Sequence, residues 1–232
     1  MLSILQGLCE ANNLFVHEFE NSLEGVNSKI AVPSDGNTNQ EYYFILECDS
    51  ADDAFIERLA NEHTEKLMDD LEELECTDES FRKNSTLILC CEAGHIADQT
   101  LLKFEEDPYY FKKNVITYSK GELEALKGEI GSEFSNDHLN MMLMSNGGEI
   151  FESFKTLSLE ADHYYPLLVR VMTKLPFVHY LPQPNQLNDL DVFVRNELDK
   201  TDLKLLDLIC VDSEELNSKV IDAIISSTWG EL

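Results

Sequence analysis

Two apolar runs, residues 42–48 and 86–91, constrain the fold of this chain more than any other feature. Each has the length and the aromatic or β-branched content of a strand, and each is apolar enough to be central in a sheet. Shorter runs at 14–19, 29–32 and 115–118 predict three further strands. Three of the five strands precede the first long helix, which favours an antiparallel arrangement of this part over a doubly wound sheet.

The predicted helices lie between and after these strands. Residues 52–75 predict the longest one, with a narrow apolar stripe and Asp or Glu over the rest of its surface. Others are expected at 2–13, 96–105 and 122–130, the last preceded by a capping box of Ser119 and Glu122. Beyond residue 130 the pattern is mostly helical, with helices expected at 137–145, 149–154, 164–174 and near 187–198, 202–209 and 213–228.

The sequence therefore predicts an α+β protein. Residues 1–130 form an N-terminal mixed sheet flanked by helices, and residues 131–232 form a mostly helical region packed on it.

The net charge of -28 limits the binding partners. Residues 47–79 carry 14 acids against Arg58 and Lys66, whereas residues 80–131 are almost neutral, with 8 acids and 7 bases. Such a charge disfavours direct binding to nucleic acid or to an anionic membrane, and it favours a basic or amphoteric partner. The near-neutral middle is the region that least repels anions.

The six cysteines indicate a reducing compartment. None forms a CxxC pair, and Cys48, Cys90 and Cys91 lie in apolar runs, which is typical of buried, reduced thiols. The N-terminus has no signal-peptide pattern, and no stretch reaches the length of about 20 apolar residues that spans a membrane. A cytoplasmic location is expected.

The segment 101–116 is unusual in composition, because three acids, a proline, three consecutive aromatics and two lysines are compressed into its nine residues 105–113. Residues 109–113 could stack on nucleic-acid bases, but a packed turn with some partner-facing surface is the favoured interpretation. In an extended segment Tyr109 and Phe111 would share one side and Tyr110 the other. We expect Phe111 in the core and Tyr110 at an interface.

No catalytic or metal-binding signature is recognised. Residues 105–107 could form an acidic Mg²⁺ or acid–base cluster, but a solvated helix end is favoured. Cys90, Cys91, His95 and Asp98 match no common zinc spacing, and the two cysteines should face opposite sides of their strand. Nucleotide-binding glycine loops and the GxSxG elbow are absent from the sequence. We therefore expect no catalytic, cofactor-binding or metal-binding residues, and a protein that is not an enzyme.

One family resemblance covers about a third of the chain. The strand at 86–90, the pattern KFEEDPYYFKK at 103–113, the strand at 115–118 and the helix beginning at Glu122 resemble the middle component of ABC-three-component (ABC-3C) systems. Within these, the likeness is greatest to the small third subunit of Lamassu-type systems, which act against phage and plasmids. The strand at 42–47 also fits, and segment 86–127 carries the resemblance.

The resemblance implies a non-catalytic adaptor that joins an SMC-like ATPase to a nuclease-type effector, without cofactors. The residues expected to bind partners come from the near-neutral middle of the chain: Tyr109, Tyr110, Lys112, Lys113 and Lys120. An acidic DNA-mimic or immunity protein, which would block a nucleic-acid-binding partner through the helix at 52–75, remains an alternative from another class. An enzyme of unrecognised type is a third.

Overall fold

A five-stranded mixed sheet forms the centre of the protein. The computed structural model describes residues 1–34, 41–94 and 96–180, together with isolated positions between 194 and 206. The strands follow one another across the sheet in chain order: β1 (Leu14–Glu18), β2 (Val26–Pro33), β3 (Tyr42–Cys48), β4 (Ser85–Glu92) and β5 (Lys112–Tyr118). The first three pair antiparallel, and β3, β4 and β5 pair parallel. The predicted mixed sheet and α+β class are confirmed.

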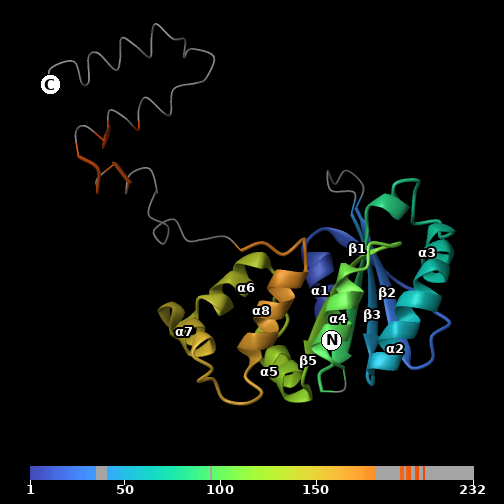
Figure 1. The fold of residues 1–232 in the computed structure, drawn as a ribbon, viewed down its shortest axis with the longest axis horizontal. Helices are drawn as coiled ribbons and strands as arrows, with labels where there is room; N and C mark the ends of the chain where they lie inside the picture. The colour runs from blue at the N-terminus through green and yellow to red at the C-terminus, as the bar shows by residue number, and fades with distance from the viewer. Residues whose placement is uncertain are drawn as a thin grey trace, which may run out of the picture. The chain divides into compact units, whose positions relative to one another are not determined.

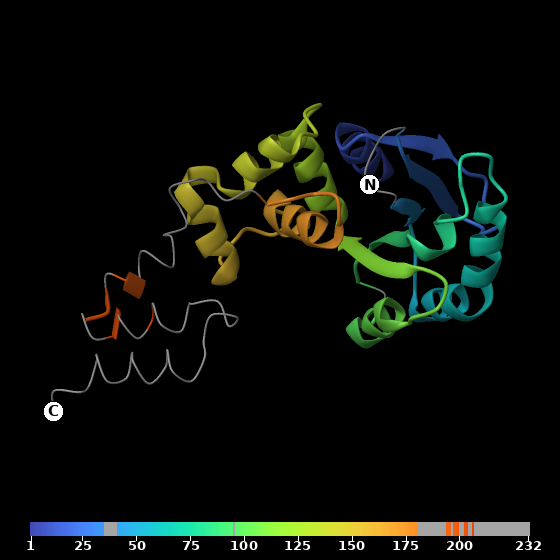
Figure 2. The same cartoon turned by 90° about the horizontal axis from the view of Figure 1, so that it is seen from above.

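Helices cover both faces of the sheet (Figure 1), as the view from above also shows (Figure 2). One face packs against α2 (Asp53–Arg58), the π-helix η1 (Leu59–His63), α3 (Thr64–Glu72) and α4 (Asp98–Glu106). On the other face, the apolar cluster takes side chains from α1 (Leu2–Ala11), α5 (Lys120–Ile130), α6 (Asn136–Leu143) and α8 (Tyr164–Lys174), of which α1 and α8 contact the strands. The remaining elements are the short 3₁₀ turns η2 (Phe81–Lys83) and η3 (Ser145–Gly148), and α7 (Glu149–Lys155).

The two central strands are apolar because both of their faces are covered. Every residue of β3 except Glu47 is buried, as is every residue of β4 except Glu92. Continuous apolar runs of this kind are typical of parallel strands buried on both faces. The connections from β3 to β4 and from β4 to β5 are crossovers that run through helices on the same face, as parallel neighbours require, and the strands keep their chain order across the sheet.

The expected division near residue 130 does not separate two cores. Leu126 and Ile130 from α5 belong to the same apolar cluster as Leu139 from α6 and Leu168 from α8. The physical reason is that α8 packs against β5, and α5 and α6 both pack against α8, so their apolar side chains join one cluster. The first of two compact units runs from Met1 to Leu181. The helices predicted near 187–198, 202–209 and 213–228 lie outside the described residues, apart from isolated positions between 194 and 206.

The local predictions vary in accuracy at the helix ends. The capping box of α5 is confirmed, since Ser119 and Glu122 each accept a hydrogen bond from the backbone N–H of the other. The helix expected at 52–75 is a composite, because five residues of π-helix separate α2 from α3. None of the described helices has the length and apolar character that a membrane crossing requires.

Side chains occupy the outer edge of β5. The backbone N–H of Val115 donates to Glu105 Oε1 at 2.7 Å, and Arg170 donates to the carbonyl oxygen of Thr117. Lys174 in turn binds both oxygens of Glu105, at 2.6 and 2.8 Å. These contacts hold α4 and α8 against the strand. They also occupy backbone N–H and C=O groups of the edge strand that could otherwise pair with another chain.

The described cysteines differ in accessibility, and this gives a testable prediction. Burial raises the pKa of Cys9 and of Cys91 to about 12, and that of Cys90 well above its ordinary value. Cys76 lies in the turn after α3 and is only half-buried, so although burial raises its pKa as well, its thiol is the most accessible of the five described. In a Cys210→Ser background, iodoacetamide at pH 8 should alkylate Cys76 first, since the thiolate is the reactive form. Peptide mass spectrometry of a time course decides, and earlier labelling of Cys90 in the folded protein would contradict the prediction.

Candidate functional site: a groove beside an aromatic loop

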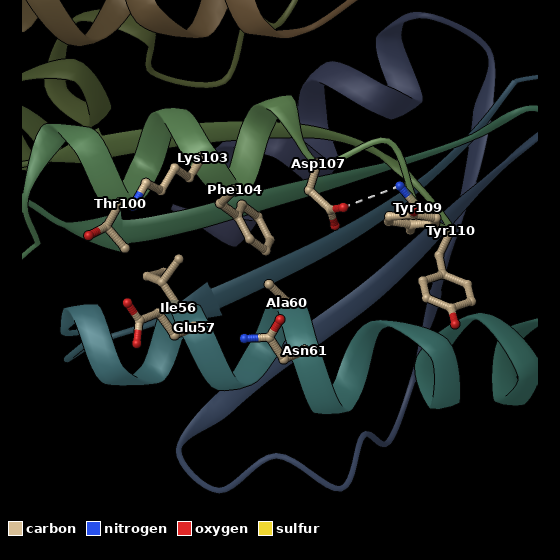
Figure 3. A pocket seen from close by; sticks show the side chains of 10 residues that line it. All are labelled: Ile56, Glu57, Ala60, Asn61, Thr100, Lys103, Phe104, Asp107, Tyr109 and Tyr110. Atoms are coloured by element: carbon tan, nitrogen blue, oxygen red, sulfur yellow. Dashed lines mark hydrogen bonds between the residues drawn. The ribbon is translucent and has the colours of Figure 1, made fainter.

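An open groove lies between two helical walls on one face of the protein (Figure 3). One wall is formed by α2 and η1, the other by α4, and the volume between them is about 610 Å³. Ile56 and Phe104 are buried at its base, while Glu57, Asn61 and Lys103 are exposed along it. We call this space the groove. It combines an apolar base with polar walls, which is the usual composition of a binding site.

The π-helical turn η1 forms part of the first wall. Ala60 and Asn61 lie in this turn and line the groove. The hydroxyl of buried Thr64 donates to the carbonyl oxygen of Ala60 at 2.9 Å, which supplies that oxygen with a donor inside the widened turn. Isolated π-helical turns are frequent at functional sites.

Residues 107–111, which we call the aromatic loop, close one end of the groove. A buried lysine holds this loop: the Lys113 side chain has no exposed surface. Its ammonium donates to the carbonyl oxygens of Asp107, Tyr109 and Phe111 at 3.1, 2.6 and 3.3 Å, and it pairs with Asp107 Oδ2 at 2.8 Å. A buried ammonium needs such partners, because an unpaired charge in the interior is costly. Lys113 therefore organises the loop from inside.

This burial corrects the sequence interpretation of Lys113 as a surface residue. The side chains of β5 alternate between the sheet faces, so Lys112 is exposed whereas Lys113 points beneath α4 and is buried. There its ammonium lies 5.9 Å from the centre of the Phe104 ring. In the folded protein Lys113 has no surface with which to contact a partner.

The three aromatic side chains do not alternate as expected. Phe111 is buried, at 2% exposure, as predicted, and its ring stacks on that of Phe44 with centroids 6.2 Å apart. Tyr109 and Tyr110, however, both line the groove, with 68% and 37% of their surfaces exposed. The expected pairing of Tyr109 with Phe111 on one side is wrong, because Tyr110 has a φ of 66°, in the left-handed region, and the loop is not extended.

The hydroxyl of Tyr110 lies next to the acidic surface of α3. Partial burial, a hydrogen bond to Glu65 and the carboxylates of Glu65 and Asp69 raise the pKa of Tyr110 above its ordinary value. Arg82 opposes this rise, but it is itself bound to Asp69 and Glu72, at 2.7 and 2.6 Å. The local potential at this end of the groove is therefore negative.

The five residues expected to bind partners do not form one patch. Tyr109 and Tyr110 meet at the groove, and Lys112 lies exposed at the start of β5 without lining it. Lys120 follows the other end of the strand, where it pairs with Glu92 at 3.4 Å. At about 3.3 Å per residue, the seven residues of β5 place its ends about 20 Å apart.

The acids at 105–107 have structural partners rather than forming a solvated helix end. Glu105 binds Val115 and Lys174, and Asp107 binds Lys113, while Glu106 alone is exposed. The sequence did not indicate these contacts because their partners lie up to 69 residues away. Asp53 is similarly engaged, since its carboxylate accepts from the N–H of Ala97 at 2.9 Å.

Within the described residues, no group of three or more His, Cys, Asp and Glu side chains is placed to hold a metal ion. Cys90 and Cys91 face opposite sides of β4, as expected, since they belong to different apolar clusters. His95, considered with them, lies outside the described residues.

Sequence reasoning missed the residues that make the groove walls. Glu57, Ala60, Asn61, Thr100 and Lys103 come from two helices some 40 residues apart, each of which looks like an ordinary amphipathic helix. The unusual composition of the aromatic loop located one end of the groove, but no local pattern indicated its walls.

Fold and site together define an α+β protein with an open, mixed apolar and polar groove beside a rigidly held aromatic loop. Residues 41–139 match the model of the family described as ABC-three component (ABC-3C) system Middle Component 1. The matched region extends from β3 into α6, so it contains the whole groove and the aromatic loop. The match supports a middle component of an ABC-3C system. No curated protein and no solved structure matches the chain.

Proposed function

We propose that this protein is a non-catalytic adaptor subunit of an ABC-three-component defence complex. In this role it bridges an SMC-like ATPase and a nuclease-type effector in a Lamassu-type system directed against phage or plasmid DNA. The observation that carries the proposal is the family match over residues 41–139, which coincides with the groove and the aromatic loop. The fold contributes the groove and the aromatic loop, whose backbone Lys113 holds, as a surface formed before any partner binds.

Two further observations support an adaptor. The carboxylates of Glu105 and Asp107 are engaged in ion pairs and hydrogen bonds that hold α4, β5 and α8 together. Tyr109, by contrast, is the most exposed aromatic ring of the loop although its backbone is fixed by Lys113. A rigid aromatic side chain with a wet hydroxyl is a common anchor in protein interfaces.

Co-purification tests the proposal. When the chain is expressed with its operon neighbours and the affinity tag is placed on a long coiled-coil ATPase among them, the two should elute together at low salt. The isolated chain should hydrolyse neither ATP nor DNA, and at a net charge of -28 it should not shift duplex DNA at physiological salt. Separate elution of the two proteins would contradict the adaptor role, and reproducible hydrolysis by the purified chain would contradict its non-catalytic character.

A further inference from the structure

We propose that the groove binds a single basic, amphipathic helix of a partner protein. This inference rests on the proposed adaptor function and names the chemistry of one of its partners.

The shape of the groove fits a helix. Its walls are themselves helical, contributed by α2–η1 and by α4 (Figure 3), so an added helix would pack between two others. Ile56 and Phe104 close the base but are almost fully buried, so the apolar surface open to a partner comes from Ala60 and the rings of Tyr109 and Tyr110. The small side chain of Ala60 permits a close approach. An amphipathic helix binds such a groove by placing its apolar face on the base.

The charge of one wall selects a basic helix. The region from Glu47 to Glu79, which includes α2, η1 and α3, carries 14 acids and only Arg58 and Lys66 as bases. Exposed carboxylates along it include Glu57, Glu62 and Glu65. Arg82 offsets Asp69 and Glu72 at the far end of α3 but leaves these three. A helix with Lys or Arg on that side would bind faster and with a defined register, because complementary charges steer association.

The opposite wall gives the helix a direction. Lys103 on α4 lines the groove, and among the described residues no carboxylate pairs with it. One acidic side chain on the partner helix could therefore face Lys103 while basic side chains face α2 and α3. A second copy of this chain fits poorly, because two subunits that each carry -28 repel one another.

The aromatic loop supplies the anchor at one end. Tyr109 is 68% exposed, and the contact of its carbonyl oxygen with the Lys113 ammonium holds its backbone in place. Because the loop is ordered before binding, little conformational entropy is lost when a partner covers the ring.

Photo-crosslinking identifies the occupant directly. A benzophenone amino acid replaces Asn61, which is exposed on the π-helical turn, in the chain co-expressed with the ATPase subunit from its operon. After illumination, mass spectrometry should find the crosslink in a helical segment of the ATPase that is rich in Lys and Arg along one side. A crosslink to an acidic or neutral segment, to a nucleic acid or to a second copy of this chain would overturn the proposal.

Matched charge reversals give an independent test. Glu57→Lys in the groove should weaken binding of the ATPase subunit about tenfold, equivalent to about 1.4 kcal/mol. Glu129→Lys makes the same change at an exposed position of α5, which belongs to the apolar cluster on the other side of the sheet. This control should leave the affinity for the ATPase subunit unchanged. Asn61→Trp, which fills the groove without altering charge, should weaken binding as well, and thermal melts verify that all three variants fold.

The outcomes separate this inference from the proposed function. If the unaltered chain binds the ATPase subunit and the groove variants bind equally well, the adaptor role stands and the groove proposal is wrong. If the unaltered chain does not bind the ATPase subunit, both are wrong.

Discussion

Replacement of Lys113 by Met should lower the free energy of unfolding by about 3–5 kcal/mol, the range found when one partner of a buried ion pair is removed. The ammonium satisfies three backbone carbonyl oxygens and the Asp107 carboxylate, and methionine can satisfy none of them. The aromatic loop should then lose its fixed conformation, so that Tyr109 and Tyr110 become mobile even under conditions in which the rest of the subunit remains folded.

Urea unfolding followed by circular dichroism measures the first effect, and limited proteolysis at residues 107–111 measures the second. Lys112→Met is the matched control, because it makes the same substitution at the adjacent, exposed position of β5. We expect the control to change the free energy of unfolding by less than about 0.5 kcal/mol, as is usual for surface substitutions. Equal stability of the two variants would show that the Lys113 contacts contribute little.

Phe111→Ala should destabilise the subunit by a similar amount, about 3–5 kcal/mol, through a different mechanism. The ring is almost fully buried and stacks on Phe44 of the central strand β3, so its removal leaves a cavity against the sheet. The loop backbone should keep its Lys113 contacts, because these involve the carbonyl oxygen of residue 111 and not its side chain.

Tyr109→Ala is the control for the aromatic loop. That ring is largely exposed, so its loss should change the melting temperature little while weakening partner binding. Thermal melts combined with the co-purification assay distinguish the two variants. If Phe111→Ala leaves stability intact, the assignment of this residue to the core is wrong, and if Tyr109→Ala unfolds the subunit, the loop is structural throughout.

The sequence predicted the central elements well, for a physical reason. Strands β3 and β4 are covered on both faces, so residues 42–48 and 86–91 form nearly uninterrupted apolar runs that can be recognised in the sequence. The capping box at Ser119 and Glu122 and the helix at 164–174 are likewise local patterns, and both were predicted correctly.

The predictions that failed concern features that depend on contacts between residues distant in sequence or on the local backbone conformation. The lysines at 112 and 113 are indistinguishable by residue type, yet β5 begins three residues before the strand expected at 115–118, and so buries one of them. The left-handed φ of Tyr110 has no marker in a run of three aromatics. The walls of the groove exist only once α4 has packed against α2.

The outer edge of β5 has a consequence for synthesis of the chain. Its backbone is protected partly by Glu105, which precedes the strand, and partly by Arg170, which lies 53 residues beyond its partner Thr117. A nascent chain that has emerged only as far as α6 would therefore lack Arg170, and the part of the β5 edge around Thr117 would be open to neighbouring chains on the same polysome. Unpaired edges of this kind promote aggregation of folding intermediates. Packing of α8 thus covers the rest of this edge, and the growing polypeptide can then no longer pair through it with its own copies.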